Sequence, residues 1–171
     1  MQRAVLSDTL NPLIHRAAAS VEYAARRYAE SLAPLRKALE MNPRMSRAHA
    51  AMGDALLNLG SLDAARSAYA AEPVADFRLT GQAILEHRSN DVDAARAAFT
   101  QLVAELGDRV LYQQAQVLAQ WGEVEPAIER LLAARASGDS GLIYARNDPF
   151  LDPLRGDPRV AGLLAQIGFT A

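Results

Sequence analysis

The chain has 171 residues, half of them hydrophobic, which is enough for one domain with a buried core. Its formal net charge of −2 argues against direct attraction to nucleic acid or to an anionic membrane surface. Cysteine is absent, which excludes disulfides, thiolate catalysis and zinc–thiolate sites, and no apolar run is long enough to span a bilayer. The bulk composition therefore predicts a globular domain, and we expect it in the cytoplasm.

One phrase recurs about every 34 residues: an alanine-rich or apolar run, a break, a second alanine-rich run, and a closing Pro or Asp. The four occurrences close at Pro43, Pro73, Asp108 and Asp139. A period of this length is typical of a helix pair that buries its apolar face only by stacking on its neighbours. Alanine favours helices, and β-branched residues never alternate over a strand-length run. The predicted fold class is all-α, an α-solenoid of antiparallel helix pairs.

The period divides the chain into repeats. We expect them at 12–45, 46–75 (shortened by Pro73), 76–107 and 108–138, with 1–11 as the second helix of a preceding repeat and 139–171 as a C-terminal cap. Gly60, Asn90 and Gly122 fall between the two helices of a pair, where a left-handed residue ends the first helix.

Small and large residues alternate at fixed places within each repeat. Counted from Ser46, Met52 and Gly53 occupy positions 7 and 8, and Ala65 and Tyr69 occupy positions 20 and 24. The matching residues elsewhere are Ala18, Ala19, Ser31 and Leu35, then Ala83, Ala95 and Phe99, then Ala115, Ala127 and Leu131. On these residues the chain resembles a tetratricopeptide repeat (TPR) protein. The resemblance implies a superhelix whose first helices line a concave groove.

The front of the chain falls out of phase with a complete repeat. Thr9 lies at position 32 of an earlier repeat, so that repeat lacks its first helix. Because stacked repeats need caps, we expect the chain to be the C-terminal piece of a longer protein, with a short native capping helix as the alternative. Exposed Val5, Leu6 and Leu10 would then favour an end-to-end homodimer.

The tail breaks the period and contains the pairs Asp148-Pro149, Asp152-Pro153 and Asp157-Pro158. An Asp N-cap followed by Pro at the first helical position predicts short helices opening at Pro149 or Pro153 and a longer one over 158–166. The string "DPFLDPLRGDPRVAGLLAQIGF" resembles the end of the TPR region of bacterial multidomain signalling proteins. That resemblance implies an N-terminal effector module in cis, a winged-helix regulator or a nucleotide cyclase.

Catalytic motifs are weak. The string "GDSG" at 138–141 resembles the nucleophile segment of serine proteases, but that chemistry needs a histidine base and an oriented carboxylate in a β-barrel. We expect a loop there. His15 and His49 are equivalent by repeat and lack convergent ligands, so we expect packing roles and no metal. No cofactor motif occurs, and a small-molecule enzyme is only a remote alternative.

The concave groove carries the candidate binding residues. The TPR resemblance assigns it to first-helix positions, occupied here by Arg16, Tyr23, Arg47, Asp54, Asn58, His87, Arg88, Arg109, Tyr112, Gln116 and Gln120. Arginines, amides and tyrosines suit a peptide, and an ordinary solvated face is the alternative. Asp54 would repel a terminal carboxylate, which disfavours binding of chaperone tails.

These observations predict a non-catalytic protein-interaction and regulatory segment of a larger bacterial signalling or transcription-regulating protein. A free-standing adaptor that binds a partner peptide in its groove is the alternative. Neither prediction involves direct contact with nucleic acid or a membrane.

Overall fold

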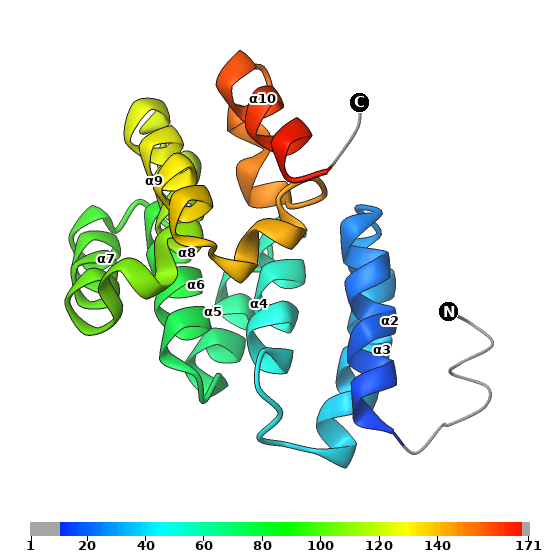
Figure 1. Ribbon diagram of the computed structural model, residues 1–171. Helices are drawn as coiled ribbons and strands as arrows, with labels where there is room; N and C mark the ends of the chain where they lie inside the picture. The colour runs from blue at the N-terminus through cyan, green and yellow to red at the C-terminus, as the bar shows by residue number, and fades with distance from the viewer. Residues whose placement is uncertain (1–10, 169–171) are drawn as a thin grey trace.

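A computed structural model describes residues 11–168, which form stacked helix pairs; no β-strand occurs within that range (Figure 1). The pairs are α2 (Pro12–Ala24) with α3 (Tyr28–Met41), α4 (Ala48–Asn58) with α5 (Leu62–Ala71), α6 (Ala75–Arg88) with α7 (Val92–Leu106), and α8 (Leu111–Gln120) with α9 (Val124–Ser137). The predicted all-α solenoid is confirmed. The expected half-repeat and the dimer contact through Val5, Leu6 and Leu10 lie outside the described residues.

The turns between paired helices follow the predicted backbone chemistry. Gly60, Asn90 and Gly122 have φ of 76°, 60° and 79°, as a left-handed end to the first helix requires. The first pair has no glycine there, and Arg26 adopts φ of 63° instead. A left-handed arginine is sterically costly, so the packing around this turn has to hold it.

Close helix crossings in the middle of the solenoid depend on two glycines around Tyr69. A Cβ at Gly53 would lie 2.6 Å from the Tyr69 ring, and one at Gly81 would lie 2.1 Å from it. The fully buried ring therefore rests against the backbones of α4 and α6. This contact explains why positions 53 and 81 have no side chain.

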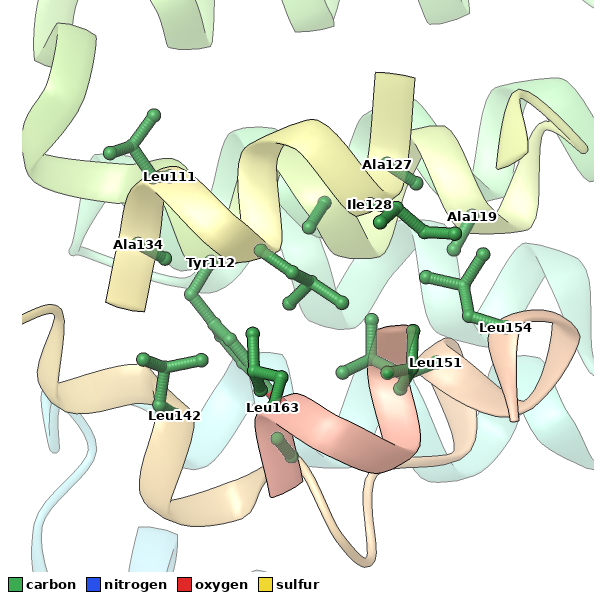
Figure 2. Packing of buried hydrophobic residues seen from close by; sticks show 14 of the residues in the cluster. Leu111, Tyr112, Ala119, Ala127, Ile128, Ala134, Leu142, Leu151, Leu154 and Leu163 are labelled. Atoms are coloured by element: carbon green, nitrogen blue, oxygen red, sulfur yellow. The ribbon is translucent and has the colours of Figure 1, made fainter. Parts of the chain in front are cut away.

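The tail folds into three short helices: η2 (Ser140–Tyr144), η3 (Pro149–Leu154) and α10 (Pro158–Gln166). Asp148 and Asp157 are N-caps that accept from the N–H of the second residue after each, so the predicted Asp-Pro helix starts are confirmed. Figure 2 shows tail leucines facing α8 and α9. They are Leu142, Leu151, Leu154 and Leu163, which share a core with Ala127, Ile128 and Leu131.

The tail also does something that the repeat pattern did not predict. Between α9 and α10 it crosses the open side of the solenoid and passes over α4 toward α2 (Figure 1). Phe150 packs in the central core with Leu79, Ile84 and Val117 rather than in the C-terminal one. The cap is therefore also a wall of the concave face.

None of the helices in residues 11–168 combines the length and hydropathy that crossing a membrane requires.

Candidate binding pocket

The first helices of all four pairs and the returning tail enclose a pocket of about 410 Å³. Its lining comes mainly from α2, α4, α6 and α8 and from tail residues between 139 and 150, with Leu35 of α3, Arg47 just before α4 and Arg109 just before α8. A volume of this size is typical of sites for a small ligand or a few residues of a peptide. The tail thus turns part of an expected open groove into a walled pocket.

The structure divides the candidate groove residues into two sets. Those that line the pocket are Arg16, Tyr23, Arg47, Asp54, Arg109, Tyr112 and Gln116. Those outside it are Asn58, His87, Arg88 and Gln120.

Several polar side chains of α8 bind the chain's own tail. The Tyr112 hydroxyl and Gln116 Nε2 both donate to Asp148 Oδ2, each at 2.6 Å. Gln120 Nε2 donates to the carbonyl oxygen of Phe150 at 2.8 Å. Amides and a tyrosine were expected to hold a peptide here, and the tail takes those hydrogen bonds instead.

The tail wall is fixed rather than loosely placed. Phe150, Leu151 and Leu154 are 2%, 2% and 1% exposed, and burying each stabilises the fold by about 2 kcal/mol. The contact of the tail with Arg26, just after the end of α2, is weaker. It is an ion pair from Arg26 to Asp152 at 2.7 Å, and both side chains are half-exposed. Displacing the wall would expose the three apolar side chains, so a ligand has to fit the pocket beside it.

The Arg47 guanidinium connects two walls of the pocket, α6 and the tail. It lies 4.6 Å from the ring centroid of Phe77 on α6 and 4.9 Å from that of Tyr144 in the tail. Both distances are within the range of a cation–π contact. Arg47 therefore joins α4, α6 and the tail at the pocket.

Asp54 on α4 contributes a carboxylate to the pocket. Its Oδ1 accepts from the Tyr69 hydroxyl at 2.8 Å, and no ion pair to it occurs among residues 11–168. Burial raises the pKa of Asp54 to about 7; the Tyr69 hydrogen bond opposes the rise, and the charge of Asp148 adds to it. Near neutral pH this carboxyl therefore exchanges between its two protonation states.

Two phenols, those of Tyr23 and Tyr112, line the pocket with these carboxylates. Burial and the nearby carboxylates raise the pKa of Tyr23 and of Tyr112, with Asp54 the larger charge effect on Tyr23 and Asp148 on Tyr112. The Tyr23 hydroxyl accepts from Asn58 Nδ2 at 3.2 Å. The interior of the pocket thus combines aromatic rings with charged groups of both signs, since Arg16, Arg47 and Arg109 line it beside the carboxylates.

Two buried polar atoms of pocket-lining side chains have no hydrogen-bond partner within the described chain. They are Nε of Arg16, a donor, and Oε1 of Gln113, an acceptor. Buried polar groups are ordinarily paired, so both need a complementary group.

The candidates outside the pocket have positioning contacts. His87 stacks on Trp121 with ring centroids 5.6 Å apart, and Arg88 donates to the Leu57 carbonyl and to Gln120. His49 contacts the Pro43 carbonyl at 2.9 Å. Within residues 11–168 no three His, Cys, Asp or Glu side chains are grouped to hold a metal ion.

The GDSG string has a structural role. Gly138 ends α9 with φ of 73°. Asp139 caps η2 and accepts from the N–H groups of Gly141 and Tyr112, which ties the tail to α8. The segment was expected to be a loop, but Ser140 and Gly141 form the first residues of η2, so it is the start of the cap instead.

Sequence reasoning missed the pocket residues that the tail supplies, chiefly Asp148 and Tyr144. The Asp148-Pro149 pair indicated a helix start but carried no information on which surface would meet it. The hydrogen bond from Tyr112 to Asp148 joins residues 36 positions apart, beyond one repeat period.

Comparison with known proteins supports the fold. The crystal structure of YrrB, described as a TPR protein with an unusual peptide-binding site, aligns with a TM-score of 0.54 and 16% sequence identity. The alignment covers 96% of this chain and 92% of YrrB. No protein-family model and no curated protein sequence matches the chain. With its repeating helix pairs, the chain therefore has a TPR-like fold.

Proposed function

We propose that this chain is a non-catalytic protein-interaction module that binds a short peptide segment of a partner in the walled pocket. The observation that carries the proposal is the pocket itself, to which the first helix of every repeat contributes. The peptide-binding site named for YrrB, which has a similar fold, supports it.

The unpaired atoms in the pocket suit a peptide. A main-chain carbonyl can accept from Arg16 Nε, and a main-chain N–H can donate to Gln113 Oε1. One peptide chain offers both groups, whereas an inorganic anion offers only acceptors. The volume limits the enclosed part to a few residues.

Selection from a random hexapeptide display library followed by calorimetric titration tests this function. Ala51 lines the pocket, so Ala51→Trp should fill it and abolish binding of the selected peptides. Exposed Ala64 on α5 provides a matched control, Ala64→Trp, which should bind as the wild type does. Full binding by a folded Ala51→Trp variant would refute the pocket as the site.

At the cellular level, we propose that the module is the regulatory segment of a larger bacterial signalling or transcription-regulating protein in the cytoplasm, with an effector in cis. The resemblance of the tail string to such proteins supports this role. A free-standing adaptor is the second candidate. The end-to-end dimer is expected only if this segment has been cut from a larger protein, so it is part of the first candidate. An immunoblot of source cells separates them: a band well above 18.4 kDa supports the larger protein.

A further inference from the structure

The charged side chains in the pocket differ in how many hydrogen bonds they already form with the protein itself. Asp148 accepts from Tyr112, Gln116 and the N–H of Phe150, and Asp139 accepts from two backbone N–H groups. These two carboxylates are bound as N-caps and as anchors of the tail. They are not available to a ligand without loss of the wall. Asp76 also lines the pocket; its Oδ1 accepts from the N–H of Phe77, and the charge of Arg47 favours its ionised form.

Asp54 is different because one neutral donor, the Tyr69 hydroxyl, is its only side-chain hydrogen-bond partner among residues 11–168. That bond uses Oδ1 and leaves Oδ2 without a hydrogen-bond partner in that part of the chain. The Tyr69 ring is fixed between Gly53 and Gly81, so the carboxylate is held in place. It is a pre-positioned acceptor at the pocket.

Most of the arginine side chains in the pocket already have partners within the protein. Arg47 is held between two aromatic rings, and Arg109 donates to the carbonyls of Leu106 and Glu105. Neither forms an ion pair within the described chain, although the charge of Arg47 is near enough to Asp54 to oppose the rise in the pKa of that carboxyl. Arg16 needs an acceptor at Nε, and a main-chain carbonyl supplies that without adding charge.

We infer that the pocket recognises a basic side chain of the partner, a lysine or arginine, whose cationic head pairs with Asp54 beside the ring of Tyr23. This inference rests on the proposed peptide-binding function and names its specificity. A cation satisfies the carboxylate that the fold leaves with one neutral donor. Tyr23, which also lines the pocket, is close enough to Asp54 for that charge to raise the pKa of its phenol. The rest of the peptide pairs with Arg16 and Gln113.

The test uses three capped pentapeptides that differ only at the central residue: lysine, glutamine or glutamate. Each is titrated by calorimetry and by amide NMR shifts into the wild-type chain, into Asp54→Asn and into Asp93→Asn. Asp93 is an exposed carboxylate at the start of α7, so its variant makes the same change in charge away from the pocket.

The expected result is that the lysine peptide binds the wild type and Asp93→Asn at least tenfold more tightly than the glutamine peptide, because a charged partner strengthens a hydrogen bond by about this factor. Asp54→Asn should remove this preference. Lysine binding should weaken about tenfold from pH 7.5 to pH 6, because Asp54 gains a proton over that range.

Three outcomes would overturn the inference. Equal binding of the lysine and glutamine peptides, or a preference for glutamate, would show that the pocket does not select a cation; if Ala51→Trp still blocked that binding, the peptide-binding function would stand. A lysine preference that survives in Asp54→Asn would assign recognition to another carboxylate. If neither these peptides nor any selected peptide bound, both the specificity and the proposed function would fail.

Discussion

Replacing Asp54 with Asn should change how the stability of the fold depends on pH. The carboxyl has an ordinary pKa of 3.8 and a folded pKa of about 7, so between these values the native state binds more protons than the unfolded state. Because of that difference, the free energy of unfolding falls as pH rises through this window and levels off above it. Asn at this position does not titrate.

The magnitude follows from the width of the window. Between about pH 5 and pH 8 the wild type should lose about 3 kcal/mol of stability that Asp54→Asn does not lose. That loss is large for a domain whose total stability is of order 5–15 kcal/mol. The amide oxygen of Asn can still accept from Tyr69, so the core contact survives.

Urea denaturation followed by circular dichroism at about pH 5, 6, 7 and 8 measures the effect, with Asp93→Asn as the control for charge. The stability difference between Asp54→Asn and the wild type should move in favour of the variant as pH rises. A difference that stays constant across the series would mean that Asp54 is ionised throughout, and the burial argument would be refuted.

Two further substitutions test the packing and the wall. Gly81→Ala should cost about 3 kcal/mol in urea denaturation, because its Cβ would overlap the Tyr69 ring, whereas Gly162→Ala, with open space around it, should be neutral or slightly stabilising. Equal effects would contradict the close packing. Tyr112→Phe should cost about 2 kcal/mol by removing the hydroxyl that donates to Asp148, and the tail should become more sensitive to limited proteolysis. An unchanged cleavage rate would show that this hydrogen bond does not hold the tail.

The features that the sequence predicted well depend on local chemistry. Gly60 and Gly122 end their helices because a left-handed turn favours glycine, and Asp157 begins a helix because its side chain accepts from a nearby N–H. Repeat spacing similarly predicted the stacked helix pairs. Each of these inferences uses residues a few positions apart, where the covalent chain limits the geometry.

The site was less predictable because it depends on contacts between distant segments. Repeat positions placed Tyr112 and Gln116 on the concave side, but did not indicate that Asp148 would cross that face and accept their hydrogen bonds. Arg26 shows the same limit on a smaller scale, since no local preference marks an arginine for a left-handed turn.

Core packing and recognition meet at Tyr69. Its ring occupies the space left by Gly53 and Gly81, and its hydroxyl holds the carboxylate to which we assign recognition. A substitution that moved the ring without unfolding the chain would therefore change ligand selectivity from inside the core. Gly53→Ala is the variant to examine, because its Cβ would lie 2.6 Å from the ring, a milder clash than at Gly81. If it keeps its fold and the full lysine preference, then the position of the ring does not govern Asp54, and recognition at this pocket is independent of the packing beneath it.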